Sequence, residues 1–314
     1  MKKNINGNIM TSNKKFLIID TNSILHRAFH ALPKLTTKKG ELVNAIYGFC
    51  LIFLKTLEEI KPDFVVATFD LPKPTFRHQK FKEYKAKRPP APVELYQQIN
   101  GIKKVLKAFG VPIFEKEGFE ADDLIGTTTQ LIKRKQAWPP IEIIILSGDL
   151  DLLQLVDNQT KLYFLRKGVK DVCFYEEKEV KERYQGLNPS QLIDFKALKG
   201  DLSDNIPGIT GIGEKIAIQL IKEFENLENL YQELEKNSER IYSLKESLQK
   251  KLKDYKDQAF ISRSLVQLDC NVPLGLKLDD CQLNINKKEL MKVFKNFNFI
   301  SLIKRCQKLN FMLK

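Results

Sequence analysis

The stretch IEIIILSGD, residues 141–149, is the most apolar run of this chain, and it ends on Asp149. Two other apolar runs end in the same way, FLIID on Asp20 and DFVVATFD on Asp70. Runs of this length between helix-like segments are typical of buried strands in an α/β sheet. In open sheets of that class, ligands bind just beyond the carboxyl ends of the strands. The three aspartates are therefore predicted to meet at one edge of a sheet.

Further carboxylates gather in two short acidic segments, FEADD at 119–123 and GDLSDN at 200–205. One Asp at a strand end can simply cap the next helix, and Asp20 before Thr21-Asn22-Ser23 fits that interpretation. Nine carboxylates at one edge would instead repel one another unless divalent cations lay among them, some bound through water. The candidate metal ligands are Asp20, Asp70, Glu120, Asp122, Asp123, Asp149, Asp151, Asp201 and Asp204.

This acidic set belongs to a chain that is basic overall. Its 314 residues carry 52 Lys+Arg against 39 Asp+Glu, a formal net charge of +13. Such a charge favours a polyanionic partner, although some genomes make lysine-rich proteins generally. The five cysteines are far apart and form no CxxC pair, which argues against zinc and suits a reducing cytoplasm. No apolar run reaches the ~18 residues of a membrane span.

Apolar periodicity predicts an α/β core followed by a mainly helical region. Helices are expected at 41–60, at 93–109 and from Glu120, with further strands at 111–115, 161–166 and 172–176. From about residue 187 the pattern turns helical. The predicted organisation is a short disordered leader (1–14), an α/β core (15–187) and a helical region (188–314).

The segment KPTFRHQKFKEYKAKR, residues 73–88, differs in composition from the rest of the core. It holds seven Lys/Arg against one acid, interleaved with Phe76, Phe81 and Tyr84. That composition lines grooves for single-stranded nucleic acid, with cations for phosphates and aromatic rings for unstacked bases. A charge run is usually only a solvated loop, but this one follows directly after Asp70 and must lie over the acidic edge.

The Gly-rich segment IPGITGIGEK, residues 206–215, joins two predicted helices. Its backbone amides can face a phosphate, which favours a helix–hairpin element that binds the duplex backbone. GxGxxG-like strings are weak signals, and no strand precedes this one, so a dinucleotide site is disfavoured. A plain interhelical turn remains the alternative.

Six ordered blocks of this sequence resemble those of the bacterial 5′→3′ exonuclease family. Its members are flap-endonuclease-like domains, found at the N-terminus of DNA polymerase I or as free-standing proteins. The resemblance implies a PIN/resolvase-like nuclease core, with a mostly parallel central sheet flanked by helices, and a helical DNA-binding region containing a helix–three-turn–helix. The blocks are FLIIDTNSILHRAFHAL (16–32), ATFDLPKPTFRH (67–78), YKAKRPPAP (84–92), GFEADDLIGT (118–127), SGDLDLLQL (147–155) and KGDLSDNIPGITGIGEK (199–215).

The resemblance also implies roles for individual residues. Two magnesium or manganese ions would be held, the first by Asp20, Asp70, Glu120 and Asp122, and the second by or near Asp123, Asp149, Asp151, Asp201 and Asp204. Segment 71–92 would form the arch, or gateway, through which a single-stranded 5′ end passes. Its catalytic, DNA-contacting residues would be Tyr84, Lys85 and Arg88, with Arg27 and Arg77 as further DNA contacts. The turn at 206–216 would bind duplex through Gly211, Gly213 and Lys215, often with a potassium ion.

The implied reaction is hydrolysis of phosphodiesters near a 5′ end, by exonuclease and 5′-flap endonuclease action. The expected substrates are DNA with a 5′ flap, nick or free end, and RNA primers on DNA, in the replication and repair of a bacterial cytoplasm. The expected enzyme is monomeric, away from any membrane and nucleoid-associated when bound to DNA. The chain has no room for polymerase or proofreading domains, which leaves open a free-standing enzyme or a piece of a longer one.

Two alternatives are a PIN-type metal-dependent RNase and a catalytically inactive DNA-binding module. The basic segment and the 206–216 turn argue against the first, because gripping duplex matters less for single-stranded RNA. The complete acidic set argues against the second.

Overall fold

The computed structural model describes residues 14–135 and 140–308, so most of the predicted leader lies outside the described residues. Its centre is a six-stranded sheet in the order β3-β2-β1-β4-β5-β6. The first five strands of that order run parallel, and only β6 is antiparallel to its neighbour. The predicted mostly parallel sheet is confirmed. The strands are β1 Lys15–Asp20, β2 Phe64–Thr68, β3 Ile113–Phe114, β4 Glu142–Ser147, β5 Thr160–Lys167 and β6 Asp171–Tyr175.

The central strands are apolar throughout because both faces of the sheet are covered. In β1, Phe16 and Ile18 belong to one buried cluster, whereas Leu17 and Ile19 belong to another on the opposite face. This alternation follows from the two-residue period of a strand. The continuous apolar runs in the sequence therefore mark strands that contact two helical layers.

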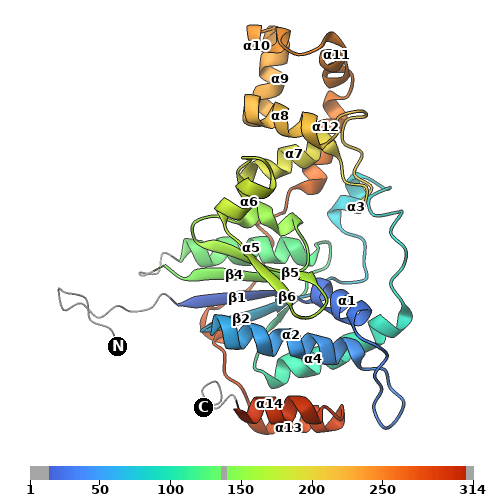
Figure 1. Ribbon diagram of the computed structural model, residues 1–314, viewed down its shortest axis with the longest axis vertical. Coiled ribbons are helices and arrows are strands. Elements are labelled where there is room, and N and C mark those ends of the chain that lie inside the picture. Colours follow the sequence, from blue (N-terminus) through green and yellow to red (C-terminus); the bar gives the residue numbers. More distant parts are fainter. Residues whose placement is uncertain (1–13, 136–139, 309–314) are drawn as a thin grey trace, which may run out of the picture.

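Two layers of helices sandwich the sheet (Figure 1). One layer consists of α1 Thr21–Ala31, α2 Asn44–Ile60 and α4 Val93–Ala108, and the opposite face carries α5 Ala121–Arg134. The short helix α3 Phe76–Lys80 lies within the basic segment, which runs along one side of the molecule toward α4. Periodicity located α2 and α4 to within a few residues of these bounds.

A bundle of short helices rises above the sheet in Figure 1. The chain enters it through α6 Glu177–Arg183 and a 3-10 turn, Pro189–Gln191, capped by Asn188. The bundle helices are α7 Leu192–Lys199, α8 Glu214–Phe224, α9 Leu227–Lys236, α10 Glu239–Tyr242, α11 Glu246–Asp254 and α12 Lys256–Val266.

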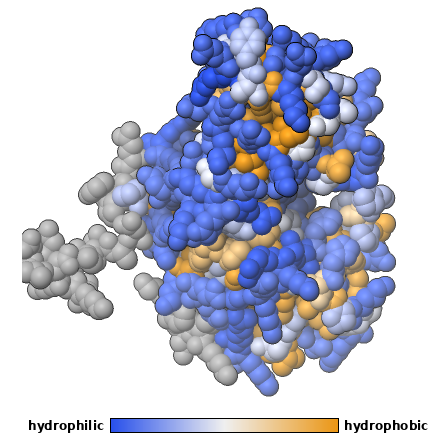
Figure 2. Space-filling view, turned by 45° about the horizontal axis from the view of Figure 1, so that its top comes forward, coloured by the Kyte–Doolittle hydropathy of each residue, from blue (hydrophilic) through white to orange (hydrophobic). Residues whose placement is uncertain are grey.

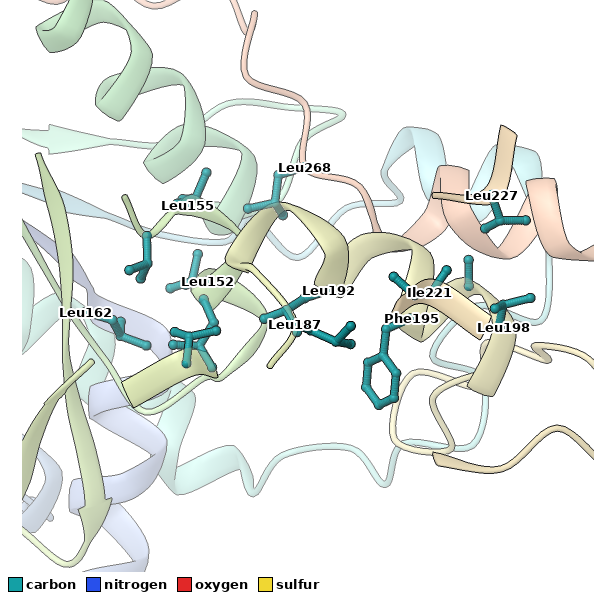
Figure 3. Packing of buried hydrophobic residues seen from close by; sticks show 14 of the residues in the cluster. Leu152, Leu155, Leu162, Leu187, Leu192, Phe195, Leu198, Ile221, Leu227 and Leu268 are labelled. Carbon is teal, nitrogen blue, oxygen red and sulfur yellow. The ribbon is translucent and has the colours of Figure 1, made fainter. Parts of the chain in front are cut away.

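The bundle and the sheet share one hydrophobic core. Leu152, which follows β4, and Leu162 of β5 belong to the same buried cluster as Leu192 and Leu198 of the bundle (Figure 3). The type of secondary structure changes near residue 187, but the core is continuous across that point. The two predicted regions therefore pack as one body.

The last two helices return to the sheet layer instead of joining the bundle. α13 Lys287–Asn296 and α14 Ile300–Lys308 lie next to the α2 and α4 layer, far from α8–α12 in Figure 1. Leu290, Phe294 and Phe299 are buried in the cluster formed by that layer. The structure thus differs from the prediction of one helical region over 188–314, because the apolar face of these helices is buried against the core.

The face in Figure 2 is mostly hydrophilic, with an apolar recess in its upper part. Within 14–135 and 140–308, no helix combines the length and the apolar character needed to cross a bilayer.

The shared core predicts how a buried substitution in the bundle will act. Leu198 is fully buried, so Leu198→Ala should lower the free energy of unfolding by about 2–5 kcal/mol. Denaturant unfolding followed by circular dichroism should retain a single transition. Leu202→Ala, at a side chain that is 96% exposed, is the matched control and should change little. A separate early transition in Leu198→Ala would contradict a continuous core.

Candidate active site

The carboxyl ends of β1, β2 and β4 open onto a cavity of about 750 Å³. Asp20 ends β1, whereas Asp70 and Asp149 follow β2 and β4. The start of α5, the turn after β4 and the loop between α7 and α8 supply the others. Seven of the nine predicted carboxylates line this cavity, namely Asp20, Asp70, Glu120, Asp122, Asp149, Asp151 and Asp204.

Hydrogen bonds from neighbouring elements orient the carboxylates at the strand ends. Asp20 accepts from the backbone N–H of Ser23 at 3.1 Å, as the cap of α1, and from Ser147 Oγ at 2.5 Å. Asp70 Oδ1 accepts from the backbone N–H of Ala121 at 2.7 Å, which ties the end of β2 to the first turn of α5. The capping interpretation of Asp20 is therefore confirmed, and the same side chain also lines the cavity.

Burial and mutual repulsion disfavour the ionised forms of several of these groups. Burial, reinforced by Asp149 and Asp70, raises the pKa of Asp20 to about 7. Burial and the charge of Asp149 raise the pKa of Asp151 to about 6, although Lys196 opposes that shift. Burial, Asp20 and Asp149 likewise raise the pKa of Asp122 well above its usual range. Cations bound in the cavity would therefore stabilise the ionised carboxylates.

Three cationic side chains already lie among the carboxylates. Lys85 Nζ donates to Glu120 Oε1 at 2.8 Å, and Arg88 donates to Asp204 Oδ1 at 2.5 Å. On the far side, Lys196 bridges Asp151 and Asp201, reaching the latter at 2.8 Å.

Asp201 titrates differently from the cavity carboxylates. Its burial would raise its pKa, but Lys196 and Ser203 lower it to about 2. Its side chain is absent from the cavity lining, but Lys196 links it to Asp151 and Ser203 links it to Asp204. Among the described residues, no three His, Cys, Asp or Glu side chains are arranged to hold a metal ion as they stand. Four of the nine carboxylates are instead paired with these lysines or with Arg88, namely Glu120, Asp151, Asp201 and Asp204.

Asp123 and Arg77, predicted as a metal ligand and a DNA contact, bind each other in the structure. Arg77 is 1% exposed and donates to both oxygens of Asp123, at 2.7 and 2.8 Å. It also donates to the backbone carbonyls of Leu265 and Gln267. The Asp123 side chain is fully buried and is not among the residues that line the cavity. A bidentate pair of this kind fastens α3 to α5 and to the chain after α12.

Tyr84 was predicted to contact DNA, but it is 3% exposed. Its hydroxyl donates to Glu120 at 3.0 Å and reaches Asp204 at 3.3 Å. In this structure its ring is therefore buried at the cavity wall. Tyr84 instead anchors the segment that presents Lys85 and Arg88.

Arg27, another predicted DNA contact, lines the cavity opposite the basic segment. Its guanidinium donates to the backbone carbonyls of Arg166 at 2.7 Å and Gly148 at 3.2 Å. These bonds hold the ends of β4 and β5 together at the cavity wall.

The predicted duplex-binding turn lies between α7 and α8, and its residues Gly211, Gly213 and Lys215 are outside the cavity lining. Gly211, Gly213 and Lys215 are exposed there. Gly208 has a φ of +59°, and a Cβ on it would come within 2.3 Å of the backbone of Gly200. Only glycine allows that close approach, so the turn is fixed tightly against the end of α7.

Ser147 and Lys196 were not singled out from the sequence. Ser147 could have been suspected from the SGD string, since it precedes a strand-end aspartate by two residues. Lys196 carries no such signal, because it is one lysine on a helix of a lysine-rich chain. Only folding shows that it reaches Asp151 and Asp201.

Comparison with known families defines the class. Residues 15–185 match the model of the 5′-3′ exonuclease N-terminal resolvase-like domain, and residues 187–289 match the 5′-3′ exonuclease C-terminal SAM fold. The chain belongs to the 5′-3′ exonuclease family.

The relatives are DNA polymerases. The chain is 40% identical over 297 residues to DNA polymerase I of Bacillus subtilis, covering 94% of this chain and 32% of the relative. It is 43% identical over 296 residues to DNA polymerase I of Caldicellulosiruptor bescii, covering 93% and 33%. The chain thus spans about a third of the length of these curated relatives.

Solved structures share the fold. The 5′-exonuclease of bacteriophage T5 with bound zinc aligns with a TM-score of 0.68 and 21% identity, over 92% of this chain and all of that one. Flap endonuclease-1 from Methanococcus jannaschii aligns with a TM-score of 0.55 and 19% identity, over 96% and 93%.

The pairing of Arg77 with Asp123 yields a prediction. Asp123→Asn should leave the Arg77 guanidinium buried without its carboxylate and cost about 3–5 kcal/mol of stability. Chemical denaturation should show this loss equally with EDTA and with magnesium. Asp149→Asn is the matched control, and it should not destabilise the metal-free protein because it relieves repulsion. Asp123→Asn with normal stability but a weakened response to magnesium would restore the role of metal ligand.

Proposed function

We propose that this chain hydrolyses phosphodiesters near the 5′ end of nucleic acid, using two divalent cations, Mg²⁺ or Mn²⁺. The observation that carries the proposal is the cavity itself, where seven carboxylates from separate elements meet in a chain of net charge +13. Burial and repulsion make that cluster unfavourable without cations. A solved structure of the T5 exonuclease with bound zinc supports metal dependence.

The donor set suits hard divalent cations, which prefer carboxylate and water oxygens. Asp20, Asp70, Glu120 and Asp122 would hold the first ion. Asp149, Asp151 and Asp204 would hold the second, with Asp201 beside it through Lys196. Asp123 is no longer included, because Arg77 occupies both of its oxygens. When bound, the ions would supply the activation of water and the neutralisation of charge at the attacking and leaving oxygens.

The remaining chemistry belongs to the base of the basic segment. Lys85 and Arg88 carry positive charge at the cavity. They are paired with Glu120 and Asp204, two of the carboxylates that would bind the divalent cations. Once displaced from those carboxylates, both can donate hydrogen bonds to the scissile phosphate and stabilise the charge that grows on it. Tyr84 holds the segment in place from inside the protein.

The proposed substrate is DNA with a 5′ flap, a nick or a free 5′ end, including RNA primers on DNA. Segment 71–92 would pass the single strand, with Arg27 on the opposite wall. The exposed turn at 206–216 would bind the duplex through Gly211, Gly213 and Lys215, together with a potassium ion. Solved T5 flap endonuclease and Rad2 complexes contain DNA, and both share this fold. We propose a monomeric enzyme of the bacterial cytoplasm, nucleoid-associated when it acts in replication and repair.

Cleavage of labelled substrates tests the reaction. With magnesium, the protein should cut 5′-flap and nicked DNA much faster than a free RNA strand. Asp149→Asn removes a carboxylate charge from the cavity and should slow single-turnover cleavage by a hundredfold or more, about 2.7 kcal/mol of barrier. DNA affinity measured in calcium should be largely retained.

The controls separate the alternatives. Glu289→Gln, on α13 and outside the cavity, should cut at the normal rate. Faster cutting of free RNA would instead indicate the PIN-type RNase. Tight DNA binding without cleavage would indicate an inactive binding module.

Metal removal should change stability in a pH-dependent way. The pKa values of Asp20 and Asp151 in the folded state are raised to about 7 and about 6. Protonation of these two groups therefore stabilises the folded state fully below about pH 4, the ordinary pKa of an Asp in the unfolded chain. This stabilisation is lost as the pH rises through the two folded-state values. In EDTA, the melting temperature should therefore fall between pH 5 and pH 8. Magnesium should restore it most at pH 8, because a hundredfold excess over Kd contributes about 2.7 kcal/mol.

Asp149→Asn combined with Asp151→Asn provides the comparison. This double variant should gain less from magnesium, whereas sodium at matched ionic strength should affect both proteins equally. A melting curve indifferent to millimolar magnesium would show that the acids do not form one cation site.

A further inference from the structure

The base of the basic segment is fastened to the loop after α7 by bonds that end on backbone atoms. The backbone N–H of Lys85 donates to the carbonyl of Asp204 at 2.8 Å. The side-chain amide of Asn205 donates in return to the carbonyl of Glu83 at 2.7 Å, across 122 residues of sequence. Two segments far apart in the chain are thus joined by a reciprocal pair of hydrogen bonds. We refer to segments 83–88 and 201–206 together as the latch.

Both central residues of the latch adopt left-handed backbone conformations. Lys85 has a φ of +56° and Asn205 a φ of +55°. Non-glycine residues rarely adopt this region, and for lysine it is less favourable than for asparagine. Strained conformations persist where surrounding contacts hold them, and they concentrate at functional sites. Here the strain lies in the residue that carries a cation into the cavity.

Little hydrophobic packing supports the latch. Tyr84 and Ile206, one from each segment, belong to a small buried cluster with Leu265 and Val266, separate from the two main clusters. A cluster of this size stabilises a contact weakly compared with a domain core. The directional bonds of the latch therefore matter for holding the two segments in register.

The cations of the segment depend on that register. Arg88 donates to the carbonyl of Ser203 at 3.3 Å and to the carboxylate of Asp204, while Lys85 Nζ lies 4.0 Å from Asp204 Oδ2. The contacts with the Asp204 carboxylate would be lost when the carboxylates bind divalent cations. The bond from Asn205 to Glu83 would remain, because neither of its atoms belongs to the acidic set.

We propose that Asn205 is a positioning residue for the nuclease reaction. Its side-chain amide keeps the latch closed, so that Lys85 and Arg88 stay directed into the cavity after their carboxylate partners are taken. The inference rests on the proposed function for its catalytic consequence, but the closure of the latch can be measured without any reaction.

The test uses Asn205→Gly in the full chain. Glycine adopts positive φ without strain, so this change removes the amide while preserving the backbone conformation. Asn237→Gly is the matched control, since Asn237 also has positive φ, at +46°, and is exposed at the end of α9. Hydrogen exchange of the peptide covering 81–88 reports on the N–H of Lys85. Single-turnover cleavage of 5′-flap DNA and its Kd in calcium report on function.

Asn205→Gly should speed exchange of the 81–88 peptide by about tenfold, the effect of losing one hydrogen bond. Cleavage should slow by a similar factor of about ten, with Kd changed less than about twofold. Asn237→Gly should match the wild type in all three measurements. Faster exchange in Asn205→Gly with unaltered cleavage would overturn the positioning role, and unaltered exchange would overturn the latch itself. A wild-type protein that cuts no substrate would refute the proposed function, while exchange would still decide whether Asn205 closes the latch.

Discussion

The repulsion among carboxylates at one edge of the sheet is the constraint on which the rest of this structure depends. Parallel strands place Asp20, Asp70 and Asp149 at the same edge, and burial makes the charge of Asp20 and of Asp70 more costly. Cationic side chains from distant parts of the chain offset part of this repulsion. Lys85 comes from the basic segment and Lys196 from α7. The acidic cavity therefore also determines where these distant elements are held.

Buried residues around the cavity determine which charged side chains face it. Arg77 and Tyr84 lie inside the protein and fix the base of the basic segment to α5. Lys85 and Arg88 then line the cavity beside its carboxylates. The shared core below the bundle keeps the loop carrying Asp204 against the same edge. The residues of this segment that the family resemblance implies as DNA contacts thus differ in role. Arg77 and Tyr84 anchor the segment, whereas Lys85 and Arg88 are charged groups that face the cavity.

Much of the fold could be predicted from the sequence because its signals are local. The apolar runs ending on Asp20, Asp70 and Asp149 are strands covered on both faces, and such strands must be apolar at every position. The return of α13 and α14 to the sheet could not be predicted, because an amphipathic helix does not specify which apolar surface it covers. Periodicity marked these helices but not their partners.

The sequence by itself determined which residues are acidic, where strands end, and that the acids gather at one edge. Tertiary structure decided which acids face the cavity. Glu120 and Asp123, both predicted as metal ligands, are three residues apart in the sequence. The same spacing forms a capping box, in which Asp123 accepts from the backbone N–H of Glu120 at 3.0 Å. Asp123 is turned inward, where Arg77, 46 residues earlier, meets it. Spacing along a helix cannot separate these two roles, because only a distant partner makes the buried charge tolerable.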